Sequence, residues 1–157
     1  MTASDPKSPD RFRFLASFLA GRSLGVTEAQ AGEAAHTDGR FVFVSAGHST
    51  LDQRREVLVQ GALLGAGSLD HRLVKALRGR PKFARRYLAL EGRRVFADLA
   101  PRIPLADALR PTGEPTTSTA DESLEVARGR RTVTTWIRTA KLSSQYQPCG
   151  VTRKDEG

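Results

Sequence analysis

The residues best placed for catalysis by their types and spacing are Arg55-Glu56-Val57-Leu58-Val59, which match the length of a helical zinc-binding motif. Enzymes with that motif need His-Glu-x-x-His, because two imidazoles one helical turn apart hold the metal and the glutamate activates a water molecule. Here Arg55 and Val59 occupy the two ligand positions, and neither side chain binds zinc. The stretch therefore predicts a helical scaffold without a catalytic centre, and we expect no cofactor or metal.

The remaining reactive side chains do not form a recognisable constellation in the sequence. His36, His48 and His71 are not spaced one helical turn apart, which favours solvated histidines over metal ligands. Cys149 has no histidine near it in the sequence, so a nucleophilic role is not predicted. Gly61–Gly67 contains three glycines but no Lys-Ser or Lys-Thr after them, so it indicates close helix packing rather than a phosphate-binding loop.

A dense group of basic residues is the first candidate for binding. On a helix, four arginines form a possible interaction face: Arg85, Arg86, Arg93 and Arg94. Such a face can contact phosphate groups or an acidic protein, and it can equally be a solvated helix surface. Glu91 lies beside the apolar stripe of the same helix, and its spacing from Arg94 predicts a structural ion pair rather than a catalytic acid.

Hydrophobic periodicity and capping residues predict four helices, and these helices would carry the side chains described above. Ser8 and Ser49 are suitable N-caps, Gly21 is a suitable terminator, and Phe12, Leu15, Phe18 and Leu19 form the predicted buried stripe of the first helix. The predicted helices are Ser8–Gly21, Leu51–Leu64, Ser68–Gly79 and Pro81–Leu99.

One strand is predicted at Arg40–Val44, because a Thr-Asp-Gly turn precedes a β-branched and aromatic run. A single strand cannot satisfy its own backbone groups, so it needs a partner. Ser23–Thr27 is one candidate and a second chain is another. Glu28–Ala35, which is rich in alanine, is expected to form a short helix.

The pattern as a whole predicts a mainly α fold, a small helical domain with one short strand or hairpin. The helical domain is expected over residues 8–110, where most of the apolar residues lie. Residues 111–157 start with a segment rich in Pro, Thr and Ser and lack a sustained hydrophobic period, so they are expected to be a linker and a disordered tail.

Composition limits the function classes further. The 157 residues include 25 Lys and Arg against 17 Asp and Glu, a net charge of +8, which attracts nucleic acids and acidic proteins alike. The single cysteine excludes an intramolecular disulfide, and the apolar run at residues 12–20 is interrupted by Arg13 and Ser17. We therefore expect no signal peptide and no membrane span, hence a cytoplasmic protein without a membrane partner.

Leu88–Val95, preceded by the helix that carries Arg55 and Glu56, resembles the N-terminal region of bacterial von Willebrand A domain proteins of the nitric oxide reductase activation and cobaltochelatase-subunit-like group. Glu56 and Glu91 match glutamates of that pattern, whereas Arg55, Val59 and Gly92 depart from it. The resemblance implies a zincin-like scaffold that assists the maturation of a metalloenzyme together with a chaperone-type ATPase. No Asp-x-Ser-x-Ser run of a von Willebrand A domain occurs in the chain, so the resemblance implies a truncated or frame-shifted member.

The sequence therefore predicts a non-catalytic accessory or assembly protein that acts through protein contacts. The alternative is a basic protein that binds nucleic acid, and an enzyme is not predicted.

Overall fold

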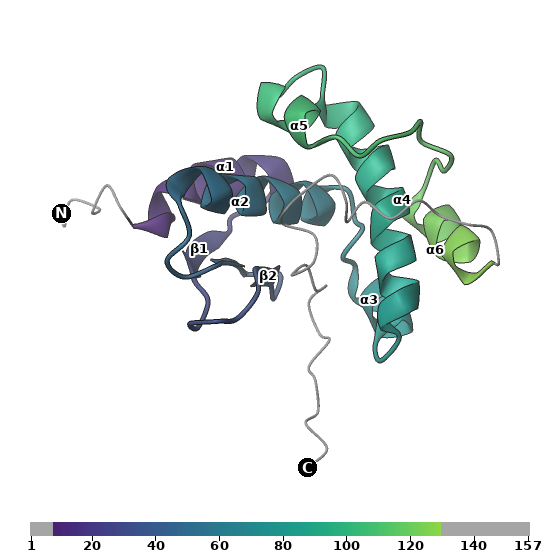
Figure 1. Cartoon of the computed structure of the whole chain (residues 1–157), viewed down its shortest axis with the longest axis horizontal. Coiled ribbons are helices and arrows are strands. Elements are labelled where there is room, and N and C mark those ends of the chain that lie inside the picture. The colour runs from purple at the N-terminus through teal and green to yellow at the C-terminus, as the bar shows by residue number, and fades with distance from the viewer. Residues whose placement is uncertain (1–7, 130–157) are drawn as a thin grey trace, which may run out of the picture.

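Helices dominate the computed structural model, which describes residues 8–129. A short 3-10 turn, Pro9–Phe12, leads into α1 (Arg13–Ala20), and α2 (Thr50–Gly65) lies alongside α1 (Figure 1). The chain continues through α3 (His71–Leu77), the long α4 (Pro81–Leu99), α5 (Pro104–Leu109) and α6 (Ala120–Arg128). The predicted mainly α fold class is confirmed.

The predicted starts of the first two helices agree with the structure because their capping residues act as expected, whereas α3 begins at His71, three residues after its predicted start at Ser68, with Asp70 as its N-cap. Ser8 Oγ accepts a hydrogen bond from the Asp10 N–H at 3.4 Å, and Ser49 Oγ accepts one from Asp52 at 3.2 Å. Gly21 ends α1 in the left-handed conformation, with φ of 68°.

A three-stranded sheet surrounds the predicted strand. β3 (Phe41–Val44) is central: it pairs in parallel with β1 (Gly25–Glu28) and antiparallel with β2 (His36–Thr37). The predicted partner segment Ser23–Thr27 thus overlaps β1 and pairs with β3, and β2 forms a hairpin with β3. The short helix expected over Glu28–Ala35 is wrong, because Glu28 ends β1 and the Ala29 N–H donates to the Val44 carbonyl at 2.8 Å.

The buried side chains form two hydrophobic clusters that divide the molecule. The sheet cluster joins α1 to the sheet and contains Phe12, Ala16, Leu24, Val26, Val42, Val44 and Val57. The helical cluster begins with Leu58 on α2 and includes residues of α3, α4, α5 and α6, with Tyr87 and Phe96 at its centre. Because α2 carries residues of both clusters, it connects the sheet side of the molecule to the helical side.

Close contact between α1 and α2 depends on glycine. A Cβ atom on Gly65 would lie 2.0 Å from the backbone oxygen of Leu19, and one on Gly61 would lie 3.1 Å from the Leu19 Cβ. These two glycines are one helical turn apart, so they let the backbone of α1 approach α2 directly.

The packed helices extend beyond the predicted end of the helical domain at residue 110. Leu124 and Ala127 of α6 belong to the helical cluster, and Ser123 is fully buried. Their apolar content is too small to reveal a core element in the sequence, and a polar contact with α4, described below, holds α6 in place. The predicted disordered tail from residue 130 onward lies outside the described residues.

No helix within residues 8–129 is both long enough and apolar enough to cross a membrane.

Candidate functional site

The ion pair between Glu91 and Arg94 lies inside the helical cluster. Glu91 on α4 is fully buried, and its Oε1 and Oε2 accept hydrogen bonds from Arg94 Nε at 2.9 Å and Nη2 at 2.6 Å. The hydrogen bond to Glu91 raises the pKa of the Arg94 guanidinium. This bidentate geometry is the strongest arrangement available to a carboxylate and an arginine.

Two serine hydroxyls complete the surroundings of Glu91. Ser68, just before α3, donates to Oε2 at 2.5 Å, and Ser123 of α6 donates to Oε1 at 2.6 Å. Thr117 lies 2.7 Å from the Ser123 hydroxyl, and the Tyr87 hydroxyl donates to the Ser68 carbonyl at 2.6 Å. With four donors, the acceptor positions of the carboxylate are filled. We therefore interpret Glu91 as a structural residue that joins α4 to α6 and to the segment before α3.

Glu56 of α2 is the second buried carboxylate, and it organises the loop between β3 and α2. Its Oε2 accepts the Ser45 N–H at 2.7 Å, and its Oε1 lies 3.3 Å from Nδ1 of His48. Gln53, one turn earlier, donates to the Ser45 carbonyl at 3.1 Å. Glu56 is 4 % exposed, whereas the His48 side chain is 41 % exposed. The carboxylate is thus used to fix the chain between the sheet and α2.

The two positions that lack zinc ligands are also engaged in the structure. Arg55 Nη1 lies 3.3 Å from Asp52 Oδ1, and Val59 is buried in the helical cluster. The three histidines are on separate elements: His36 stacks on Phe43, His48 faces Glu56, and His71 begins α3. No three acidic, histidine or cysteine side chains within residues 8–129 form a metal-binding group. Cys149 lies outside the described residues.

The four arginines of the predicted interaction face are not brought together on one surface. Arg85 is exposed, Arg86 is partly buried, and Arg93 Nε donates to the Thr112 carbonyl at 3.1 Å. Arg94 is turned toward Glu91 and is only 16 % exposed. Helical geometry explains the separation, since Arg85 and Arg94 lie on opposite sides of α4, about 180° apart around its axis.

An aromatic surface on α1 was missed in the sequence. Phe14 and Phe18 are 78 % and 77 % exposed, and we call this pair the aromatic face. The prediction that Phe18 is part of the buried stripe is wrong, because Phe12 and Ala16 are the buried residues of this segment. Phe14 and Phe18 are four residues apart and therefore lie on one face of the helix, opposite Ala16. This spacing was the signal in the sequence for a separate aromatic face.

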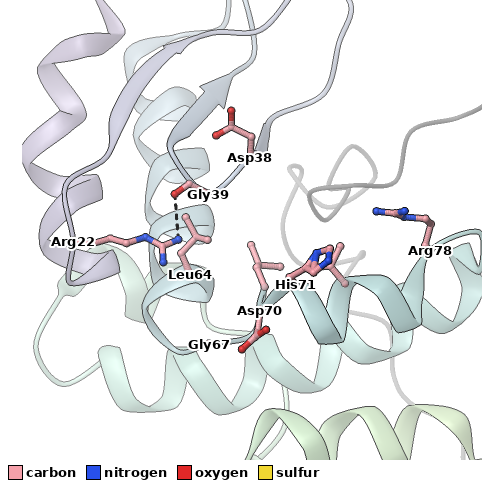
Figure 2. Close-up of a pocket in the computed structure, with 10 residues that line it drawn as sticks. Arg22, Asp38, Gly39, Leu64, Gly67, Asp70, His71 and Arg78 are labelled. Carbon is pink, nitrogen blue, oxygen red and sulfur yellow. Dashed lines mark hydrogen bonds between the residues drawn. The ribbon is translucent and has the colours of Figure 1, made fainter.

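A cavity of about 590 Å³ lies between the turn from β2 to β3 and the start of α3 (Figure 2). Leu64, Leu69 and Val74 supply its apolar lining. Its ionisable residues follow α1, lie in the turn or belong to α3 and its ends; they are Arg22, Asp38, Asp70, His71 and Arg78.

The chain matches no protein-family model, no curated protein and no solved structure. The similarity to the von Willebrand A group stays a prediction from the residues named above.

Proposed function

We propose that this chain is a non-catalytic accessory or assembly protein that acts through protein contacts, with the aromatic face of α1 as its contact surface. The observation that carries the proposal is the exposure of Phe14 and Phe18, which are 78 % and 77 % exposed. Burying a phenylalanine side chain stabilises by roughly 1.5–3 kcal/mol. Because folding leaves these two rings exposed, a partner that covers them can gain this free energy on binding.

The charge around the aromatic face defines the chemistry of the partner. The Arg13 guanidinium lies 5.3 Å from the centre of the Phe14 ring, and Arg11 precedes Phe14 by three residues. Residues 11–22 include no acidic side chain. An acidic protein surface with an apolar groove fits this combination, because it would cover the rings and meet the arginines.

The two buried glutamates support a contact function over catalysis. The acceptor positions of Glu91 are filled by Arg94 and two serines, and Glu56 holds the Ser45 backbone and faces His48. The resemblance to the von Willebrand A group implies a chaperone-type ATPase as the partner, in the maturation of a metalloenzyme. We propose this as the first partner to test.

The test compares tagged wild-type chain with the Phe14→Ser/Phe18→Ser variant in its native host, with crosslinking before lysis and quantitative mass spectrometry. Leu51→Ser is the matched control, since Leu51 is a 48 % exposed apolar residue on α2. We expect an acidic protein, crosslinked through α1, to be retained by the wild type and the control and lost by the double variant. Identical crosslinked proteins for all three chains would overturn the proposal.

Binding to nucleic acid is the alternative function, and one observation favours it. Four exposed basic residues follow each other across the connection between α3 and α4: Arg78, Arg80, Lys82 and Arg85. A protein that binds DNA phosphates releases counterions from the DNA, so its affinity falls steeply as the salt concentration rises. Fluorescence anisotropy with random duplex DNA over a salt series measures that slope, and absence of binding at low salt would remove this alternative.

A further inference from the structure

The cavity between the β2–β3 turn and α3 is independent of the aromatic face and has the size of a ligand site. Its volume of about 590 Å³ falls in the range of pockets that hold small organic molecules, roughly 300–1,000 Å³. Leu69 and Val74 are buried in the helical cluster and form part of its lining, so the apolar surface is held by the core of the protein.

The arginine and histidine side chains of this cavity have hydrogen-bond donors available. Figure 2 shows the guanidinium groups of Arg22 and Arg78 on opposite sides of the pocket, with the His71 ring between them. Arg22 uses Nη2 for one hydrogen bond to the Gly39 carbonyl at 3.2 Å. Within residues 8–129, no hydrogen bond or ion pair joins the side chain of His71 or Arg78 to another residue.

The two carboxylates of the cavity are partly occupied by backbone groups. Asp38 Oδ1 accepts hydrogen bonds from the N–H groups of Arg40 and Phe41, both at 2.8 Å. Burial raises the pKa of Asp38, but these backbone bonds outweigh it and hold the pKa below its ordinary value. Asp70 Oδ1 accepts the Arg72 N–H at 3.1 Å at the start of α3, and its carboxylate points away from Arg22 and Arg78 in Figure 2.

We propose that this pocket binds a small organic anion, a phosphate monoester or a carboxylate with an apolar body. The acid group bonds to the guanidinium group of Arg78 beside the His71 ring, and the apolar body covers Leu69 and Val74. Arg22, on the opposite side of the pocket, adds positive charge. A guanidinium recognises phosphate and carboxylate by the same paired donors, so the two acids share one site. The proposal does not depend on the contact function of α1.

The test is a titration of the full ¹⁵N-labelled chain followed by NMR, with phenyl phosphate and benzoate as probes. We expect saturable shifts at the amides of Gly39, Leu69 and His71. Inorganic phosphate and benzylamine are the comparison ligands, because the first lacks the apolar body and the second reverses the charge. Both should bind at least several-fold more weakly than phenyl phosphate.

Arg78→Gln and Arg22→Gln separate this site from general attraction to a basic protein. Loss of a charge-assisted hydrogen bond should make Arg78→Gln bind roughly tenfold or more weakly, whereas Arg22→Gln, which removes a charge from the opposite side, should weaken binding less. Arg85→Gln removes the same charge from the exposed surface of α4, outside the pocket, and should leave the affinity unchanged. An equal loss in Arg85→Gln, equal binding of either comparison ligand, or no saturable shift at the pocket would overturn the proposal.

Discussion

Glu91 and Glu56 are both buried glutamates on helices, yet they stabilise different kinds of structure. Glu91 accepts hydrogen bonds from Ser68, Arg94 and Ser123, which are up to 32 residues away in the sequence. Glu56 contacts the Ser45 backbone and lies near His48, both on the loop that leads into its own helix. The first carboxylate therefore joins separate helices, whereas the second fixes a local connection.

Their partners also differ in charge. Arg94 keeps its positive charge at all ordinary pH values, and the hydrogen bond to Glu91 raises its pKa further. His48 is a partly exposed partner, and the hydrogen bond that Glu56 accepts comes from the neutral backbone N–H of Ser45. Burial alone therefore does not determine the role of a carboxylate, because its partners decide what its removal would disturb.

The largest effect is expected from Glu91→Gln. The uncharged side chain leaves the Arg94 guanidinium without its ion pair, and breaking one partner of a buried pair costs about 3–5 kcal/mol. Since Arg94 is 16 % exposed and can gain some hydration, we expect a loss near the lower end, about 3 kcal/mol of unfolding free energy. Urea denaturation measures it; a loss under about 1 kcal/mol would show that the pair adds little.

Gly65→Ala tests whether the stability of the sheet side of the molecule depends on the packing of α1 against α2 rather than on the Glu56 carboxylate. The new Cβ would lie 2.0 Å from the Leu19 backbone oxygen, so α1 must move away from α2. We expect a loss of about 1–3 kcal/mol, although alanine favours helix. Gly61→Ala is the matched control, because its nearest contact is a Leu19 side-chain atom at 3.1 Å, and it should cost less. Equal losses would contradict the direct helix contact.

Tyr87→Phe removes the hydroxyl that donates a hydrogen bond to the carbonyl of Ser68, a partner of Glu91. We expect a loss of about 1 kcal/mol at neutral pH. Burial, followed by the charge of Glu91, raises the pKa of Tyr87 above its ordinary value of 10.0. Its stabilising effect is therefore fully present below pH 10 and is lost as the pH rises above it, because only the unfolded chain ionises.

Denaturant unfolding at pH 8 and pH 11 checks this dependence. The difference in stability between wild type and Tyr87→Phe should shrink at pH 11, and it would stay constant if Tyr87 ionised equally in both states.

The smallest effect is expected from Glu56→Gln. The amide oxygen of glutamine can still accept the Ser45 N–H, and the amide group can face His48. We expect a loss below about 1 kcal/mol, from the weaker neutral hydrogen bond. Urea denaturation of Glu56→Gln and Glu91→Gln measures the contrast, and a similar loss in both variants would show that the two carboxylates contribute equally to stability.

The sequence predicted structure best where the information was local. Ser8, Ser49 and Gly21 marked helix ends because capping depends on neighbours a few residues away. The Glu91 and Arg94 pairing followed from their separation of three residues. Ser68 and Ser123 could not be assigned to Glu91, because only the tertiary packing of α6 and α3 brings their hydroxyls there.

The errors have a similar origin. Phe18 was assigned to the core from its apolar character, but the packing of α1 leaves its side exposed. The arginines of α4 appeared as one face in the sequence, whereas Arg93 and Arg94 are directed to partners on the folded protein. The parallel pairing of β1 with β3 depends on the whole connection between them, which periodicity does not describe.

The division between the two hydrophobic clusters has a consequence for synthesis on the ribosome. Every buried residue of the sheet cluster lies before Leu58, and every buried residue of the helical cluster lies at or after it. At about 5–20 residues per second, several seconds separate the translation of Val57 from that of Ala127. The nascent chain can therefore complete the sheet cluster before the last helix exists, and α2 then offers Leu58 and Leu63 as a surface on which the later helices assemble.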